Sequence, residues 1–159
     1  MKWFENIKIE MLSQNNAETI ANDWHYDGIY SFYDMVKDPE DFEEIISSSL
    51  RGNRYFQVVN DDELIGYFCI EELSAKRVEI GLGLRPDLTG QGLGLSFLKM
   101  VESFILKRQK KYQTFVLSVA SFNERAIKVY LKAGYVKVGT EMLASNNSEH
   151  EFIILEKTY

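Results

Sequence analysis

Three glycines at alternate positions, Gly90, Gly92 and Gly94, have the spacing that most clearly indicates a chemical role. They follow an apolar, strand-like run that ends at Pro86, and they open a long amphipathic segment. Backbone N–H groups at the start of a helix attract phosphate, because the positive end of the helix dipole lies there. Glycine also leaves room for a pyrophosphate to approach the backbone closely. The segment therefore predicts an anion-binding loop.

Three interpretations of this loop compete. An ATP- or GTP-binding P-loop requires a lysine directly before Ser or Thr, but here Leu95 precedes Ser96. A dinucleotide-binding fold requires an acidic residue about 20 positions further on. This chain has Gln109, Lys110 and Lys111 in that neighbourhood. For the glycines taken alone, an ordinary tight turn is the remaining alternative.

A second group of spaced residues lies in the segment 123–135. Asn123, Ala126 and Tyr130 are separated by three and four positions, so they share one face of a predicted helix. The small Ala126 would let a ligand lie close to that face, with Tyr130 projecting beside it. We expect Ile127 and Leu131 to pack into the core instead. A half-buried core aromatic is the alternative role for Tyr130.

Together, residues 86–94 and 123–135 resemble the two signature segments of the GNAT-type N-acetyltransferases. The family patterns are Gln/Arg-x-x-Gly-x-Gly/Ala and Asn-x-x-Ala-x-x-x-Tyr-x-x-x-Gly-Phe/Tyr. The resemblance covers residues 55–157, and Thr89 stands where the family usually has Gln or Arg. It implies direct transfer of an acetyl group from acetyl-CoA to a primary amine of a small molecule or peptide. A non-catalytic acyl-CoA sensor or regulatory module of the same fold is the alternative, and Thr89 favours it.

The resemblance also implies roles for individual residues. Tyr130 is the expected general acid for the leaving thiolate, because a phenol has a reference pKa of about 10. The amide of Leu82 is expected to polarise the thioester carbonyl, on a strand that Gly81 and Gly83 would bulge. The complete set of predicted coenzyme contacts is Leu82, Gly83, Leu84, Thr89, Gly90, Gln91, Gly92, Leu93, Gly94, Leu95, Asn123, Ala126 and Tyr130.

The general base is less clearly indicated. Glu79 is the first choice because it lies on the strand before the loop, where some family members keep a catalytic glutamate. Glu71, Glu72, Asp27 and a chain of water molecules are alternatives. Each carboxylate could equally be a solvated or salt-bridged surface group.

The acceptor pocket is expected in the aromatic segment 24–33, where the family builds one wall of that pocket. Trp24, Tyr26, Asp27 and Tyr30 are the candidates, since aromatic ring faces and carboxylates together can hold a cation. The alternative is that these rings cover the core beneath a loop.

Hydrophobic periodicity predicts the elements that must position these residues. The strands are expected at about 3–11, 55–59, 64–70, 78–84, 114–120, 136–143 and 151–156, and the helices at about 14–24, 39–50, 92–108 and 123–133. Asp38 and Gly134 are the expected N-cap and C-terminal stop of two of the helices. The order β-α-α-β-β-β-α-β-α-β-β predicts an α/β (α+β) fold. Its mixed, mostly antiparallel sheet has about seven strands, with helices on both faces, as in GNAT proteins.

Composition limits the remaining possibilities. The 159 residues suit a single domain, and a net charge of −6 does not suit a nucleic-acid binder. Cys69 is the only cysteine, and no signal peptide or membrane span is evident, so we expect a cytoplasmic protein without membrane contact. With His25 and His150 as the only histidines, no metal site is predicted. The closing strands could pair across a homodimer.

Overall fold

The computed structural model describes residues 4–159, which form two compact units. Unit 1 comprises Met1–Cys69 and Leu82–Leu88, and unit 2 comprises Ile70–Gly81 and Thr89–Tyr159. The chain passes from one unit to the other at residues 69–70, 81–82 and 88–89, so sequence segments far apart are joined in each unit. The single domain expected over residues 1–159 remains a prediction.

Seven strands hydrogen-bond in the order β1-β2-β3-β4-β5-β7-β6. Their bounds are β1 (Ile7–Met11), β2 (Tyr55–Asn60), β3 (Glu63–Ser74), β4 (Arg77–Leu84), β5 (Thr114–Ala120), β6 (Val136–Ser145) and β7 (Ser148–Thr158). β4 and β5 pair in parallel, whereas β1–β2, β2–β3, β5–β7 and β6–β7 pair antiparallel. The predicted mixed, mostly antiparallel sheet is therefore confirmed.

The helices follow the predicted order, with one break and three added 3₁₀ turns. The α-helices are α1 (Gln14–Asp23), α2 (Pro39–Ile46), α3 (Ser48–Arg51), α4 (Gly94–Arg108) and α5 (Glu124–Lys132), and the 3₁₀ helices are η1 (Gly28–Tyr33), η2 (Met35–Lys37) and η3 (Pro86–Leu88). The expected continuous helix over 39–50 is wrong. Ser47 has an extended backbone and its hydroxyl accepts from the Leu50 N–H at 3.4 Å, so a new helix begins there.

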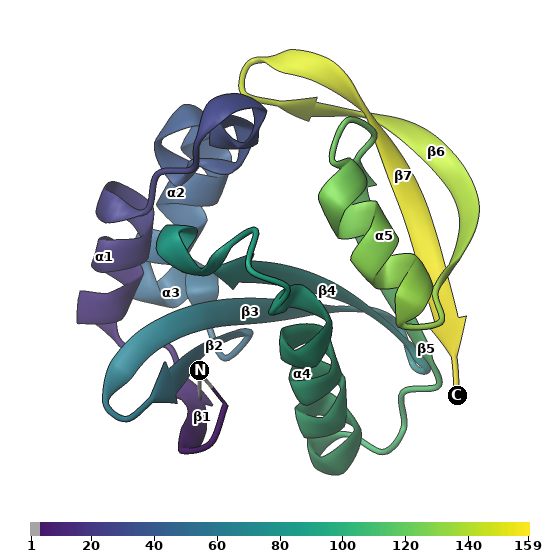
Figure 1. The fold of residues 1–159 in the computed structure, drawn as a ribbon, viewed down its shortest axis with the longest axis horizontal. Coiled ribbons are helices and arrows are strands. Elements are labelled where there is room, and N and C mark those ends of the chain that lie inside the picture. Colours follow the sequence, from purple (N-terminus) through teal and green to yellow (C-terminus); the bar gives the residue numbers. More distant parts are fainter. Residues whose placement is uncertain (1–3) are drawn as a thin grey trace. The chain divides into compact units, whose positions relative to one another are not determined.

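In unit 1, helices α1 and α2 lie next to each other (Figure 1). The apolar side of α1 (Ala17, Ile20, Ala21) packs into a cluster of buried residues with Ile45 and Tyr55. Two left-handed residues, Asp61 and Asp62, make the turn between β2 and β3. The first strand begins at Ile7 rather than near residue 3, which lies outside the described residues.

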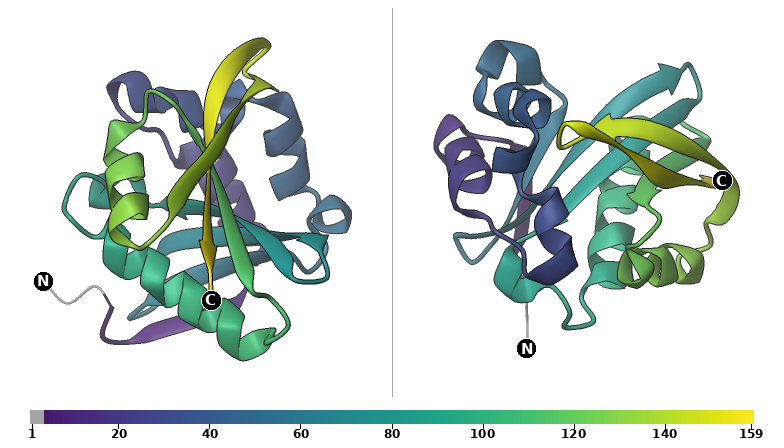
Figure 2. Two further views of the ribbon diagram at one scale, coloured as in Figure 1. Left: turned by 90° about the vertical axis from the view of Figure 1, so that its right-hand side faces the viewer. Right: turned by 90° about the horizontal axis from the view of Figure 1, so that it is seen from above.

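In unit 2, α4 buries an apolar stripe that includes Phe97, Val101 and Ile105. Strand β5 is buried along most of its length and pairs with β7 over seven residue pairs. Figure 2 shows β6 and β7 as a long twisted hairpin, which is longer than the sequence predicted. No helix among residues 4–159 has both the length and the apolar character needed to cross a membrane.

Candidate functional site

Two glycines of the loop adopt a backbone conformation with positive φ. Gly90 and Gly92 have φ angles of +71° and +77°, a region that side chains rarely tolerate. The helix α4 then begins at Gly94, two residues later than predicted. A Cβ on Gly94 would lie 3.3 Å from Cγ2 of Val129, so glycine lets α5 pack closely against the start of α4. The two helices, both labelled in Figure 1, contact each other within unit 2.

The N-terminus of α4 differs from that of every other α-helix in the described chain. Side chains cap the other four helices, and those caps are Ser13, Asp38, Ser47 and Asn123. Among the described residues, no side chain caps α4, and its first turn contains no acidic residue. The first N–H groups of a helix need acceptors, and the positive end of the helix dipole favours anionic ones.

On α5, the three residues of the second motif have different surroundings. Asn123 is 9% exposed, and its side-chain oxygen accepts from the Ala126 N–H at 3.1 Å. Its side chain therefore serves as the helix cap. Ala126 and Tyr130 are half-buried. The expectation for Leu131 is wrong: it is 52% exposed, because Val129 faces Gly94 and makes the packing contact instead.

Glu79 lies where β4 and β5 are still paired. The β4–β5 register covers three residue pairs, the last of which joins Glu79 to Val116. Partial burial raises the pKa of the Glu79 carboxyl, and the nearby carboxylates Glu71 and Glu141 raise it further. A raised pKa brings a carboxylate nearer to the range in which it accepts protons efficiently at neutral pH.

In unit 1, the end of β4 carries Leu82, Gly83 and Leu84. A Cβ on Gly83 would collide with the ring of Tyr67, so only glycine permits this contact. The Leu84 carbonyl accepts from the Tyr26 hydroxyl at 2.8 Å. The structure therefore explains Gly83 by close packing, while a bulge at Gly81 and Gly83 stays a prediction.

The four predicted acceptor residues do not share one environment. Trp24 is 6% exposed and packs against the Tyr67 ring, with 6.1 Å between ring centroids, so it supplies core packing rather than an open ring face. Tyr26 reaches β4 through its hydroxyl, and burial raises its pKa. Asp27 is exposed, and its carbonyl accepts from the N–H of the half-buried Tyr30 at 3.1 Å.

Asp34 organises this segment from a buried position, and that burial could not be predicted from the sequence. Its buried carboxylate accepts from the Tyr26 N–H at 2.8 Å and lies 3.1 Å from Nδ1 of His25. The residue joins two 3₁₀ helices, and a lone aspartate in an aromatic stretch carries no sequence signal that distinguishes it from Asp27.

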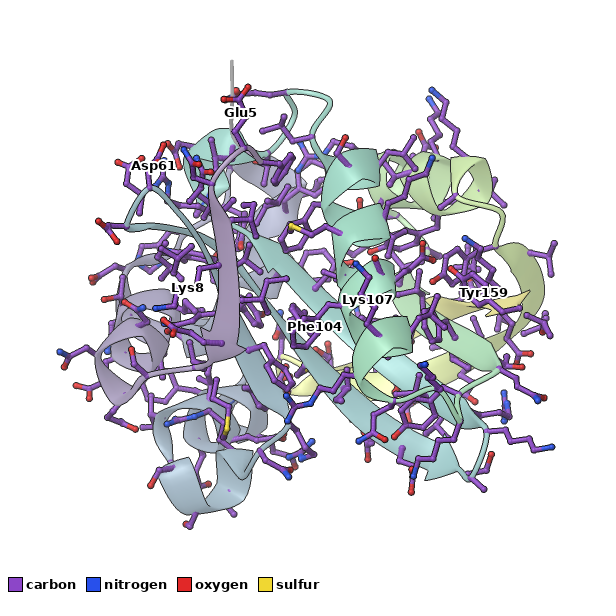
Figure 3. All side chains as sticks on the ribbon, turned by 90° about the horizontal axis from the view of Figure 1, so that it is seen from below. Glu5, Lys8, Asp61, Phe104, Lys107 and Tyr159 are labelled. Carbon is purple, nitrogen blue, oxygen red and sulfur yellow. The ribbon has the colours of Figure 1, made fainter. Side chains whose placement is uncertain are left out.

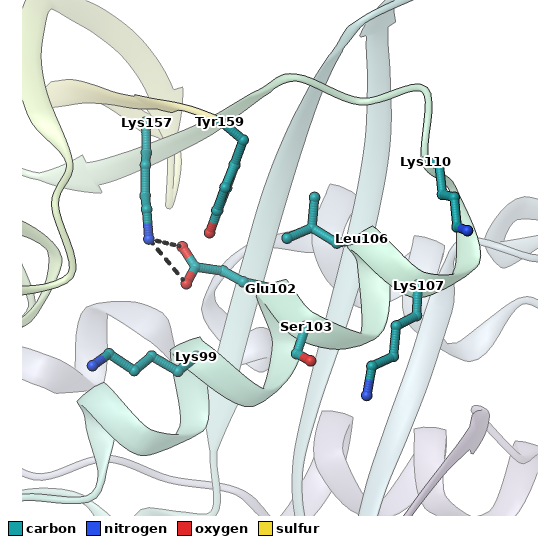
Figure 4. A pocket seen from close by; sticks show the side chains of 8 residues that line it. All are labelled: Lys99, Glu102, Ser103, Leu106, Lys107, Lys110, Lys157 and Tyr159. Carbon is teal, nitrogen blue, oxygen red and sulfur yellow. Dashed lines mark hydrogen bonds and ion pairs between the residues drawn. The ribbon is translucent and has the colours of Figure 1, made fainter.

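An open hollow of about 440 Å³ runs along α4 in unit 2. It is lined by Lys99, Glu102, Ser103, Leu106, Lys107, Lys110, Lys157 and Tyr159. Lys107 projects outward from α4 beside Phe104 (Figure 3). Figure 4 shows Lys99 and Lys107 on α4 and Lys110 on the loop after it, pointing in different directions, so their charges do not converge on one point. None of these lining residues belongs to the predicted coenzyme set.

Comparison with known structures supports the fold. A spermidine N-acetyltransferase chimera from Vibrio cholerae and hSSAT superposes with a TM-score of 0.77 at 17% identity, covering 97% of this chain and 96% of the other. A GNAT-family acetyltransferase from Bacillus anthracis gives a TM-score of 0.73 at 15% identity, covering 97% and 95%. Ribosomal-protein-S5-alanine acetyltransferase from Vibrio fischeri gives 0.65 at 19% identity, covering 98% and 94%.

The family model of the acetyltransferase (GNAT) family matches residues 19–135. The matched range contains both the glycine loop and the Asn123–Gly134 segment, so it includes the residues on which the sequence resemblance rested. It covers well over half of the chain. The protein therefore belongs to the GNAT family of acetyltransferases.

Proposed function

We propose that this protein is an N-acetyltransferase that uses acetyl-CoA to acetylate a primary amine of a small molecule or peptide. The family match over residues 19–135 carries the proposal. The structure adds a physical reason for an anionic coenzyme: α4 begins with an uncapped turn preceded by two glycines of positive φ. In its bound state the coenzyme supplies the acetyl group as a thioester.

The loop residues 89–95 fit the diphosphate of such a coenzyme. Backbone N–H groups at the start of a helix are phosphate donors that need no lysine or arginine. Thr89 lacks the longer side chain that the family usually has there, so the backbone must contribute most of the binding. The proposed contacts from Leu82, Gly83 and Leu84 to the pantetheine arm remain predictions.

Tyr130 is the proposed general acid. Its phenol can donate a proton to the departing sulfur, and solvent can restore that proton. The helix face it shares with Ala126 supports this role, because the small neighbour leaves space beside the ring.

Glu79 is the proposed general base. The acceptor amine must lose a proton before it attacks, and a lysine-like amine has a reference pKa of about 10.4. A carboxylate whose pKa is raised by burial and by Glu71 and Glu141 holds that proton better than an ordinary surface glutamate does.

The acceptor is the least determined part of the proposal. Among the similar structures, one is described as a Vibrio cholerae spermidine N-acetyltransferase in complex with CoA and spermine, with a TM-score of 0.72 at 16% identity. Another is named for the alanine of a ribosomal protein. We therefore propose to test both polyamines and a peptide with an N-terminal alanine.

The test is release of CoA thiol from acetyl-CoA with spermidine, spermine and the alanine peptide as acceptors. We expect turnover with at least one of them, and Tyr130→Phe should lower kcat by about 10²-fold or more while CoA affinity is kept. Tyr112→Phe is the matched control, because it also removes a tyrosine hydroxyl, one that donates to Glu72 Oε1 at 2.9 Å outside the proposed site. CoA binding without turnover on any acceptor would instead identify a non-catalytic sensor.

A further inference from the structure

The C-terminal turn of α5 ties Tyr135 directly to Tyr130. The Tyr135 N–H donates to the Tyr130 carbonyl at 3.1 Å, and the Gly134 N–H donates to the Leu131 carbonyl at 3.1 Å. These two bonds, with Gly134 at φ +100°, form a Schellman motif. Tyr130 and Tyr135 are the first and last residues of this closed turn.

The Tyr135 side chain continues the connection. Its ring centroid lies 6.3 Å from that of Tyr130, with the ring planes tilted by 54°. The side chain is buried, at 2% exposed, and its hydroxyl donates to Oε2 of Glu102 at 2.7 Å. Burial and this hydrogen bond both raise the pKa of Tyr135, so at neutral pH the hydroxyl stays a donor.

Glu102 provides a fixed acceptor for that hydroxyl. It projects from the middle of α4 and is only 3% exposed. The Lys157 ammonium lies 3.4 Å from its carboxylate, and Figure 4 shows Lys157 and Tyr159 pointing toward it. The same ammonium lies 5.7 Å from the centroid of the Tyr135 ring. A buried carboxylate with these partners has little freedom to move.

Helix α5 depends on such end contacts. It has nine residues, and none of its own side chains is fully buried. A short helix whose side chains are at most half-buried depends strongly on its caps and on the contacts of the residues next to its ends. At its N-terminus that contact is Asn123, and at its C-terminus it is Tyr135.

We propose that Tyr135 and Glu102 are positioning residues for Tyr130. They fix the last turn of α5 and thereby the place of the Tyr130 hydroxyl. The inference rests on the proposed function of Tyr130 as general acid. A displacement of about 1 Å at a reacting group can lower a rate by about a hundredfold, so a lost anchor has a measurable effect.

The test is a double-mutant cycle between Tyr135→Phe and Tyr130→Phe, read as kcat and as KM for acetyl-CoA. Tyr135→Phe removes the bond to Glu102 but keeps the ring and the backbone turn. We expect kcat to fall about tenfold with KM changed less than about twofold. In the Tyr130→Phe background the same change should have less than about a twofold effect, because the hydroxyl it positions is absent.

Equal effects of Tyr135→Phe in both backgrounds, or an unchanged kcat, would overturn the inference while leaving the role of Tyr130 intact. A wild-type rate for Tyr130→Phe alone would instead overturn the proposed general acid, and the inference with it. Tyr112→Phe controls for loss of a tyrosine–glutamate bond elsewhere.

Two further variants separate positioning from stability. Glu102→Gln keeps an acceptor for the Tyr135 hydroxyl and should retain kcat within about twofold. Tyr135→Phe with Glu102→Met removes both partners, so no buried polar group is left unpaired and folding is retained. We expect kcat of that double variant to stay about tenfold low. Recovery to the wild-type rate would show that Tyr135 stabilises the fold without positioning Tyr130.

Discussion

Helices α2 and α4 begin in opposite ways. At α2, the Asp38 carboxylate accepts from the Glu40 and Asp41 N–H groups at 3.1 and 3.3 Å, and Pro39 occupies the first position. Several acidic side chains are crowded there. The pKa of Asp41 is raised to about 6, mainly because burial removes solvent from its carboxyl and to a smaller extent because of the negative charges of Asp38, Glu44 and Glu40. At α4, by contrast, among the described residues there is neither a side-chain cap nor an acid in the first turn.

This difference shows how one chain separates stability from binding. A capped and acid-rich N-terminus is complete without a ligand, and it repels anions. An uncapped terminus preceded by glycines is less stable by itself, and it attracts anions. The protein therefore places its own negative charge where structure is needed and leaves it out where the coenzyme phosphate is proposed to lie.

Glu79 is a third carboxylate to compare, because neighbouring carboxylates disfavour its negative charge. Among the variants that test this comparison, Glu79→Gln should have the largest effect on activity. We expect Glu79→Gln to lower kcat by about 10²-fold at neutral pH if Glu79 is the base. A base acts when deprotonated, so wild-type activity should fall as the pH drops through a pKa above the reference glutamate value of about 4.3. An acid limb that is unchanged in Glu79→Gln would contradict this role.

The melting temperature of Glu79→Gln gives an independent test of the raised pKa of Glu79. The folded-state pKa of Glu79 is raised, so between the unfolded and folded values the folded state binds more protons. Wild-type stability is therefore lost as the pH rises through that window. Above it, Glu79→Gln should melt about 1–2 °C higher than wild type, while below it the two should converge. Calorimetric melting at several pH values measures both.

A pair of glycine substitutions tests whether the open end of α4 is a binding site. Gly92 and Gly52 both have positive φ, +77° and +55°, and a Cβ at either would meet nothing within 4 Å. Alanine should therefore strain the backbone at both positions, by about 1 kcal/mol or more, without a steric clash at either. We expect only Gly92→Ala to raise the Kd for CoA, by about thirtyfold, because it displaces the loop amides. Titration calorimetry giving equal Kd values for the two variants would contradict the proposed site.

Adding a charge near the start of α4, or removing one from the start of α2, should have a smaller effect than the glycine substitution. Gln91→Glu adds a carboxylate beside the start of α4 and should weaken CoA binding about tenfold at low salt, less at high salt. Glu40→Gln removes a first-turn acid from α2 and should cost about 0.3–1 kcal/mol of stability without changing CoA affinity. A weakened affinity in Glu40→Gln would show that net charge, not location, controls binding.

Removal of the α2 cap should affect stability alone. Asp38→Ala leaves the Glu40 and Asp41 N–H groups without their side-chain acceptor and should cost about 1 kcal/mol, or about 2–4 °C in melting temperature. CoA affinity should not change. A stability equal to wild type would mean that the carboxylate crowding at Asp41 offsets the capping bonds.

Local signals explain what could be predicted from the sequence. The alternation of β5 predicted Thr114–Ala120 with the bounds that the structure has. Gly134 was recognised as the left-handed stop of α5, and its φ of +100° confirms that prediction. The glycine loop and the Asn123 motif likewise depend on neighbours within one turn, and so they identified the family.

Features that depend on contacts between residues far apart in the sequence could not be predicted. Trp24 is buried by packing against residues of several other elements, including Tyr67. The Tyr67 ring explains Gly83, which the sequence suggested as a bulge. Glu102 and Tyr135 lie 33 positions apart and meet only in the fold. At Ser47 a local capping bond outweighs an apolar spacing that continues to Leu50, which is why one predicted helix is two.

The most direct test is an amide NMR titration with acetyl-CoA, because it reports on the loop backbone itself. We expect the N–H signals of Gly90, Gly92 and Gly94 to shift on binding, while that of Gly52, also of positive φ, stays in place. Saturable binding that leaves the three loop signals unmoved would contradict a phosphate site at the start of α4.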